Sequence, residues 1–445
     1  MPRHLWIPIA GVAAALTALT AAAAAMARQS PDPPSASAAI LGMLEDGAVK
    51  RQLIGDCTGC HQLAPANVFP GGRTRTAAEW TAVVQRMQAF AGHGSGFPVI
   101  GVRDAAATGA WLAANLDGSI PSVSRPPARA DMQIREYPYP YDRDLPHDLA
   151  VLGDGSLAIT GMLTNQMLVL DPTDGSYDEI PIPVERANPR AIEVDDGGNW
   201  WVVLGAPNQL ARYEPAIDHW TTWDLGMYAH EARPDNRGRV WFNGHFTSNP
   251  VKVGYLDIAS GAIRTFDVPT PQPLAEGGAI PYGLAVGRDG TLWGSDLRGN
   301  RIYAVDAQGG AVRTWDMPTT HSSPRRIDLD HRGVLWIPEY ANNTLTSFDP
   351  ASGRFTQYPL PIPDALPYVV RADSARDIIW IGTGAADAVL AFRPASAAFD
   401  VYPLPTAGAL VRHIAIDPHT RDVWAAYGAS PGIPPKIARL RLVAP

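Results

Sequence analysis

The stretch that decides the fold is Pro281–Trp293, which reads PYGLAVGRDGTLW. Two short apolar runs flank a Gly-Arg-Asp-Gly turn, and this pattern predicts a pair of antiparallel strands. The same order of proline, apolar strand, glycine turn and second strand recurs from residue 146 onward. Six tryptophans mark the second strands: Trp201, Trp241, Trp293, Trp336, Trp380 and Trp424.

The repeats begin near residues 146, 189, 229, 281, 324, 367 and 411. Seven units of about 43 residues with short alternating strands predict an all-β, seven-bladed β-propeller with four strands in each blade. We expect this domain to span residues 132–443, with residues 132–137 supplying the outer strand of the last blade. One longer interval indicates an insertion, Pro269–Gly278, in a surface loop.

The repeats resemble the virginiamycin B lyase (streptogramin lyase) family. Its members are seven-bladed propellers with a recurring P-x-G-I pattern followed by D-G-x-L-W-F-T-E. The best local matches here are Pro281–Leu284 with Asp289–Trp293, and Gly333–Glu339. The resemblance is specific for the fold and poor for the activity, because one propeller fold hosts many functions.

The residue that follows each repeat's proline should begin the innermost strand, so the seven equivalents should face the central channel together. They are His147, Arg190, His230, Tyr282, Arg325, Tyr368 and Arg412, where Ala229 and Val411 take the place of the proline before His230 and Arg412. A ring with three arginines and no acid predicts a site for a small anionic or polar ligand, held through forked donors. The alternative interpretation is a hydrated channel rim that binds nothing specific.

The family resemblance also implies an alternative function, a carbon–oxygen lyase or hydrolase that uses a histidine base and Mg²⁺ held by two glutamates. His230 and Tyr282 match the family's neighbouring histidine and tyrosine and would be catalytic in that case. The glutamates are missing, since Tyr228 and Gly244 stand at their positions. Magnesium prefers oxygen ligands, so their loss weakens this hypothesis. Acids stand three residues after the tryptophan in other blades, at Asp296 and Glu339, and Glu231 and His245 near His230 are possible substitutes.

Composition limits the remaining function classes. The chain has 445 residues, of which 46% are hydrophobic and 18% charged, with a net charge of −8. This length allows two domains of ordinary size. The negative balance excludes the basic stripe of a nucleic-acid binder, so we expect no nucleic-acid partner.

The segment Cys57-Thr58-Gly59-Cys60-His61 contains both cysteines of the chain. C-x-x-C-H is the attachment pattern of haem c, in which Cys57 and Cys60 bind one porphyrin covalently and His61 ligates its iron. A zinc site would need two more ligands, and no other cysteine exists. A redox dithiol usually lies in a βαβ unit, which this segment lacks.

Residues 40–117 resemble a small, all-α monohaem cytochrome c domain. Apolar spacing predicts a helix over 41–55, a capping box at Thr76–Glu79 starts a second helix, and Asp104 caps a third. The second helix should present one apolar face made of Trp80, Val83, Val84, Met87 and Phe90.

The second axial ligand is open on sequence alone. Met87 on that apolar face is the first choice, because a methionine sulfur raises the reduction potential. His93 is the main alternative and would imply a lower potential, and Met43 is the third candidate.

The remaining segments indicate export and tethering. Residues 1–27 read as a secretory signal peptide with an A-x-A cleavage site at Ala25–Ala27, and an uncleaved membrane anchor is the alternative. Residues 28–39 read as a tether and residues 118–131 as a proline-rich linker between the domains.

These patterns lead to three functional hypotheses. The first is a periplasmic haem-dependent oxidoreductase component that exchanges electrons with a soluble or membrane-bound periplasmic donor or acceptor. The second is a lyase of the type above, tethered to a cytochrome and dependent on Mg²⁺. The third is a non-enzymatic propeller that docks a redox partner.

Overall fold

The computed structural model describes residues 36–90, 103–120, 125–244, 251–269, 279–306, 308, 310–428 and 433–443. All described residues belong to one compact unit, Pro34–Pro445. The predicted signal peptide, His93, His245 and residues 270–278 of the predicted insertion lie outside the described residues. Among the helices that are described, none has the length and apolar character needed to cross a membrane.

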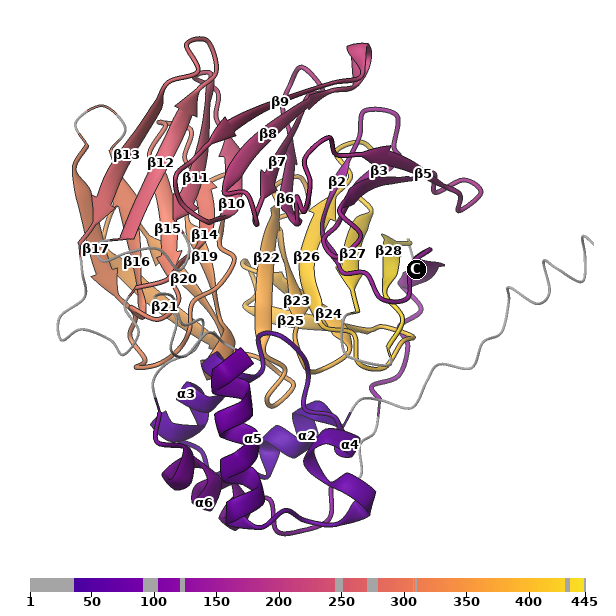
Figure 1. Ribbon diagram of the computed structural model, residues 1–445, viewed down its shortest axis with the longest axis vertical. Coiled ribbons are helices and arrows are strands. Elements are labelled where there is room, and N and C mark those ends of the chain that lie inside the picture. The colour runs from indigo at the N-terminus through magenta and orange to yellow at the C-terminus, as the bar shows by residue number, and fades with distance from the viewer. Residues whose placement is uncertain are drawn as a thin grey trace, which may run out of the picture. The chain divides into compact units, whose positions relative to one another are not determined.

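Two of the three predicted N-terminal helices, α5 and α6, begin where the sequence predicts (Figure 1). The single helix predicted over 41–55 is wrong, since α2 and α3 are separated by residues 43–47. They are α2 (Ser37–Gly42), α3 (Ala48–Cys57), α4 (Pro65–Val68), a 3₁₀ turn (Pro70–Gly72), α5 (Ala77–Phe90) and α6 (Ala105–Asn115). The capping box before α5 is confirmed, since Thr76 N donates to Glu79 Oε2 at 2.9 Å and Glu79 N donates to Thr76 Oγ1 at 3.2 Å. Asp104 caps α6 by accepting from two backbone N–H groups.

The predicted apolar face of α5 is only partly correct. Trp80 and Val84 are buried, and Val83 and Met87 are half-buried. Phe90 is 81% exposed, so the prediction that it belongs to the buried face is wrong. Phe90 is the last residue of α5, and no described element covers it there.

The seven-bladed propeller is confirmed, with seven four-stranded antiparallel sheets. In the first four blades the strands are β2 (Pro146–Val151), β3 (Leu157–Gly161), β4 (Gln166–Leu170), β5 (Tyr177–Pro181); β6 (Pro189–Val194), β7 (Trp200–Leu204), β8 (Gln209–Glu214), β9 (His219–Asp224); β10 (Ala229–Pro234), β11 (Arg239–Gly244), β12 (Val251–Asp257), β13 (Ile263–Val268); and β14 (Pro281–Val286), β15 (Leu292–Asp296), β16 (Arg301–Val305), β17 (Val312–Asp316).

The last three blades follow the same order. Their strands are β18 (Asp328–Leu329), β19 (Leu335–Glu339), β20 (Thr344–Asp349), β21 (Arg354–Pro359); β22 (Pro367–Asp373), β23 (Ile378–Thr383), β24 (Ala388–Arg393), β25 (Ala398–Pro403); and β26 (Val411–Ile416), β27 (Val423–Tyr427), β28 (Lys436–Leu442), joined by β1 (Met132–Pro138). Short 3₁₀ turns occur at Pro215–Ile217 and Tyr340–Asn342.

The six repeat tryptophans lie on second strands and are buried. In three blades a turn aspartate accepts a hydrogen bond from the indole nitrogen: Asp195 from Trp201 at 2.9 Å, Asp235 from Trp241 at 3.0 Å and Asp330 from Trp336 at 3.1 Å. The indole supplies a large buried apolar surface, and the aspartate satisfies its one polar group.

The ring closes as the sequence predicts. β1 pairs antiparallel with β28, in a register that runs from Met132 opposite Leu442 to Pro138 opposite Lys436. Glu136 of β1 also accepts hydrogen bonds from Tyr427 Oη, Thr406 N and Lys436 Nζ. The N-terminal end of the propeller is therefore fixed to the last blade by both backbone and side-chain bonds.

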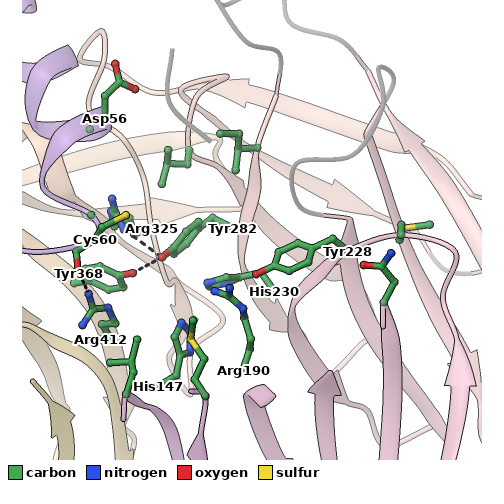
Figure 2. A pocket seen from close by; sticks show the side chains of 18 of the residues that line it. Asp56, Cys60, His147, Arg190, Tyr228, His230, Tyr282, Arg325, Tyr368 and Arg412 are labelled. Atoms are coloured by element: carbon green, nitrogen blue, oxygen red, sulfur yellow. Dashed lines mark hydrogen bonds between the residues drawn. The ribbon is translucent and has the colours of Figure 1, made fainter. Parts of the chain in front are cut away.

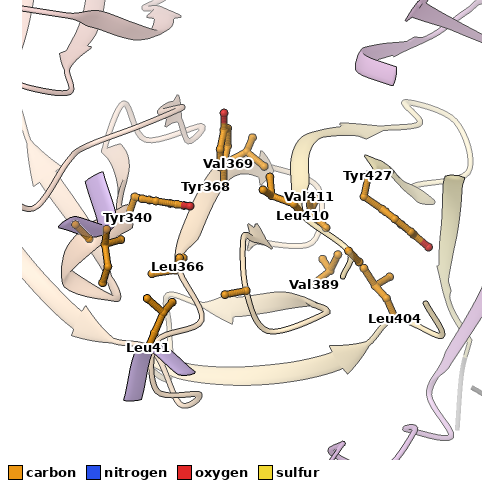
Figure 3. Packing of buried hydrophobic residues seen from close by; sticks show 14 of the residues in the cluster. Leu41, Tyr340, Leu366, Tyr368, Val369, Val389, Leu404, Leu410, Val411 and Tyr427 are labelled. Atoms are coloured by element: carbon orange, nitrogen blue, oxygen red, sulfur yellow. The ribbon is translucent and has the colours of Figure 1, made fainter. Parts of the chain in front are cut away.

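One apolar cluster contains residues of both the helical segment and the propeller. Figure 3 shows Leu41 of α2 in the same cluster as Tyr340, Leu366 and Val411 of the blades. Buried apolar surface thus continues from the helices into the propeller, which fixes the helical segment against the blades.

Replacing Glu136 tests the ring closure. We expect Glu136→Ala to lower the free energy of unfolding by about 1.5–3 kcal/mol, because hydrogen bonds to a charged group are lost and Lys436 is left without its carboxylate. Urea denaturation followed by circular dichroism measures this loss. The matched control is Glu185→Ala at an exposed position, which should change stability by less than about 0.5 kcal/mol. Equal values for the two variants would contradict the assignment.

Candidate functional site

All seven predicted channel residues line one cavity of about 700 Å³ (Figure 2). In six blades the residue before the ring residue begins the innermost strand: Pro146, Pro189, Ala229, Pro281, Pro367 and Val411. In the fifth blade Arg325 lies three residues before β18, and Pro324 instead forms an isolated bridge with Glu339. Histidines, tyrosines and arginines share the cavity with an apolar rim made of Leu145, Met162, Met227, Ile280 and Leu297. Binding of a ligand by this ring stays a prediction.

The fifth blade departs from the regular pattern at this point. Its inner strand β18 is only two residues long, and Arg326 instead pairs with the inner strand of the next blade. Arg326 N donates to Tyr368 O at 3.2 Å, and Val370 N donates to Arg326 O at 3.1 Å. Because Arg326 pairs with the next blade and not with its own, the backbone of Arg325 and Arg326 lies inside the channel.

The C-x-x-C-H segment forms one wall of the cavity. The lining includes Asp56, Gly59 and Cys60. Arg412 Nη2 donates to Cys60 O at 2.7 Å, which ties the segment to the last blade. A Cβ on Gly59 would lie 2.8 Å from Arg325 Nη2, so a larger residue at this position would require the guanidinium to shift.

Tyr340 links the same segment to the tyrosines of the channel. Its hydroxyl donates to Thr58 O at 2.9 Å and lies 2.9 Å from Thr58 Oγ1. Its ring meets that of Tyr368 edge-on, with the centroids 5.6 Å apart. Tyr340 is buried, so these bonds are protected from water.

Arg325 is surrounded by three tyrosine rings. Its Cζ lies 3.9 Å from the ring centroid of Tyr340, 4.4 Å from that of Tyr368 and 5.1 Å from that of Tyr282. Arg325 Nη1 donates to Tyr282 Oη at 3.2 Å, and the hydroxyls of Tyr282 and Tyr368 are hydrogen-bonded to each other. These contacts stabilise a cation through the negative faces of the rings.

His147 is held by the adjacent Asp148, with 2.8 Å between His147 Nδ1 and Asp148 Oδ1. Burial lowers the pKa of His147 to about 4, against the opposing effect of Asp148. Burial raises the pKa of Asp148, but Arg326, His413 and His147 together bring it well below its usual range. His147 is therefore neutral at pH 7 and Asp148 is ionised.

A buried charged layer spans the channel one residue beyond the ring. Arg326 forms ion pairs with Asp148 at 2.8 Å and with Glu231 at 3.2 Å. These partners come from the first and third blades, so the contacts cross the channel. Arg371 Nη2 lies 2.8 Å from His413 Nε2 and extends the layer.

The predicted haem ligands lie in the helical segment. Cys57 is the last residue of α3, and both cysteines are free thiols. Burial raises the pKa of Cys57 to about 12, so this thiol is protonated at neutral pH. His61 Nδ1 lies 2.9 Å from Gln62 O, an arrangement that fixes the ring and leaves Nε2 as the nitrogen for a metal. Met87 is half-buried on α5.

The acids considered for magnesium are used elsewhere. Glu231 belongs to the charged layer, Asp296 forms an ion pair with Arg301, and Glu339 bonds Thr346 and Gln357. None of the three lines the cavity. Within the described ranges there is no group of three or more metal-ligating side chains suited to an ion.

Several lining residues were missed by the sequence analysis. Tyr228, Asp56 and Gly59 were not predicted to face the channel, and neither was Tyr340 behind it. The repeat spacing identifies one residue per blade and contains no signal for residues from loops or from the helical segment. The sequence did contain a signal for the charged layer, because Asp148, Glu231 and Arg326 each follow a ring residue directly.

Comparison with known proteins identifies relatives of the propeller. The Virginiamycin B lyase family matches residues 272–433. The propeller is virginiamycin B lyase-like. A structure of virginiamycin B lyase from Staphylococcus aureus aligns with a TM-score of 0.61 at 22% identity and covers 70% of this chain and 100% of that one. A streptogramin B lyase structure gives the same TM-score and identity, and covers 70% and 98%.

A catalytically inactive virginiamycin B lyase from Staphylococcus aureus with quinupristin aligns with a TM-score of 0.61 at 20% identity and covers 70% of this chain and 100% of that one. No curated protein matches the chain. At these identities the likeness shows the fold alone. The comparisons favour the lyase-like alternative over the electron-transfer hypothesis, and they give no support for a cytochrome c domain or bound haem.

The pKa of His147 predicts a pH dependence. Between about pH 6.5 and about pH 4 the unfolded chain binds a proton at His147 that the folded chain does not, so stability falls as the pH falls. This contribution reaches about 3 kcal/mol, at about 1.36 kcal/mol per pKa unit. We expect His147→Gln to be less sensitive to acid than the wild type.

Urea unfolding at several pH values across this window measures the effect. His219→Gln, at an exposed position on β9, is the control and should keep the wild-type slope. A wild-type slope in His147→Gln would contradict the lowered pKa.

Proposed function

We propose that the chain binds haem c through Cys57 and Cys60 and that this haem exchanges electrons with a ligand held in the channel cavity. The proposal depends on one observation: the C-x-x-C-H segment is a wall of that cavity. A redox group attached there would lie next to whatever the arginine ring binds. We further propose that the protein acts in the periplasm, with a soluble or membrane-bound electron donor or acceptor.

The residues of the helical segment fit a haem. Both thiols are free, and His61 presents Nε2 because Nδ1 lies against a backbone carbonyl. Two buried donor atoms, Trp80 Nε1 and Arg75 Nε, have no hydrogen-bond partner among the described residues. Arg75 Cζ lies 5.4 Å from the ring centroid of Trp80, so the two donors are neighbours. Buried donors need acceptors, and the propionate groups of haem are suitable ones.

Haem, when bound, supplies one-electron transfer between its ferrous and ferric states. His61 and Met87 would ligate its iron. The propeller residues would bind and orient the ligand, and Arg412 and Tyr340 hold the haem-binding segment against the cavity.

A lyase is the second candidate function, and the family match favours it. His230 stacks on Tyr282 with ring centroids 4.3 Å apart, which preserves the neighbouring pair expected from the resemblance. Among the described residues that line the cavity, Asp56 is the one acid, and it is ion-paired with Arg103. We therefore rank Mg²⁺-dependent elimination below electron transfer.

Expression in a host that attaches haem c separates the two functions. We expect a red protein whose mass increases by one haem and whose colour survives denaturation, because the bond is covalent. Cys57→Ser with Cys60→Ser should be colourless, and a colourless wild type would contradict the proposal. Opening of a cyclic depsipeptide that stops when a chelator is added would instead support the lyase.

Replacing Met87 tests the second axial ligand. We expect Met87→Ala to lower the midpoint potential and to change the ferrous spectrum, because the thioether stabilises ferrous iron. Spectroelectrochemical titration measures both. Met43→Ala removes the third candidate ligand, which is also half-buried in the helical segment, and should leave the potential unchanged. An unchanged potential in Met87→Ala would reject the assignment in favour of another ligand.

A further inference from the structure

The two buried arginines at the cavity wall lack an acidic partner. Arg325 and Arg412 are 3% and 4% exposed, and neither has a carboxylate partner among the described residues. Asp56, the acid in the lining, is ion-paired with Arg103 at 2.6 Å. Buried charges in proteins are normally paired, so a counter-charge for these cations is expected nearby.

Tyr282 and Tyr368 are in position to supply the counter-charge for the arginines. Tyr282 and Tyr368 come from the fourth and sixth blades, and their hydroxyls meet beside Arg325 of the fifth. Arg325 donates to Tyr282 Oη and lies over both rings. A phenolate there would accept one hydrogen bond from the other tyrosine and face the guanidinium.

We propose that Tyr282 and Tyr368 form a tyrosine–tyrosinate pair, with Arg325 as counter-ion, that takes the proton of a phenolic hydroxyl in the cavity. The inference rests on the proposed function in one respect, that the cavity ligand is the electron donor or acceptor. The ionised tyrosine and the binding of the ligand do not depend on haem.

The charges around the pair assign the ionised member. Burial raises the pKa of Tyr368, but Arg325, Arg412 and Arg326 together lower it below its usual value. Burial raises the pKa of Tyr282 well above its usual value, so Tyr282 stays the proton donor of the pair. The titratable and charged groups that face the pair are Arg325, Arg412, Arg326, Tyr340, Tyr228, His230 and Cys60.

The other end of the cavity suits a carboxylate. Arg190 Nε donates to Asn188 Oδ1 at 3.1 Å, and its guanidinium lies 5.2 Å from the ring centroid of Tyr228. Its two terminal nitrogens have no hydrogen-bond partner among the described residues and can form a forked pair with a carboxylate. The ring of His230 lies 4.3 Å from that of Tyr282 and 5.5 Å from that of His147, measured between centroids.

These features describe an aromatic hydroxy acid as the ligand. The carboxylate would bind Arg190, the ring would contact the histidines and the apolar rim, and the hydroxyl would reach Tyr368. In the transfer the O–H bond of the ligand breaks and an O–H bond forms on Tyr368. The electron pair stays on the ligand oxygen, whose negative charge Arg325 and Arg412 stabilise. No oxidant takes part in this step.

The ionised tyrosine is tested by ¹³C NMR of protein labelled at tyrosine Cζ, a signal that differs between phenol and phenolate. We expect one signal to titrate below the range of ordinary tyrosines, and to be lost in Tyr368→Phe. Arg325→Met should move that titration to higher pH, because the counter-charge is gone. Tyr427→Phe, which removes a buried tyrosine bonded to Glu136, should leave it unchanged. Absence of such a signal in the folded wild type would overturn the proposal.

Ligand binding is tested by calorimetry with 4-hydroxybenzoate and benzoate, which differ only in the hydroxyl. We expect 4-hydroxybenzoate to bind the wild type at least roughly tenfold more tightly, since a hydrogen bond to a charged group is gained. Tyr368→Phe should remove this preference, and Arg190→Met should weaken both ligands. Equal affinities in the wild type, or no binding of either, would reject the ligand class. Because neither measurement detects electrons, a haem-free protein that passes both would disprove the proposed function and leave this inference intact.

Discussion

Pairing of β1 with β28 is the constraint on which the rest of the structure depends. It joins residues 132–138 to the last blade and makes seven separate sheets into one closed ring. Only in a closed ring do residues from blades far apart in sequence meet across a channel. Contacts between the first and fifth blades, such as Asp148 with Arg326, have no other geometric basis.

The channel is built in two layers with different tasks. The ring that faces the cavity has three arginines, His147 in its neutral form, His230 and the hydrogen-bonded Tyr282 and Tyr368. The layer beyond it contains ion pairs among Asp148, Glu231 and Arg326, all buried. The ion pairs of the second layer hold the ring residues in place, while the arginines of the first layer have no carboxylate partner among the described residues.

The helical segment supplies a wall of the channel cavity that the blades do not supply. Its C-x-x-C-H turn covers one side of the cavity and is held by Arg412 and Tyr340. The shared apolar cluster in Figure 3 makes this placement a part of the core. A group attached to Cys60 would be adjacent to the ligand site without any movement of the chain, which is why we favour a redox function over elimination.

The sequence determined the features that repeat or that depend on neighbours in the chain. The spacing of Pro281 and its equivalents gave seven blades and the ring residues, and the capping box at Thr76 gave the start of α5. The sequence prediction was wrong for Phe90, because the periodicity of a helix does not show where the neighbouring element that covers its apolar face ends. Tertiary structure alone decided that Gly59 lies against Arg325, that Tyr282 and Tyr368 share a hydrogen bond, and that Arg326 pairs with the next blade. These contacts join residues 30 or more positions apart in the sequence. They form only when the ring closes and buries the side chains, and a local sequence pattern contains no information about that closure.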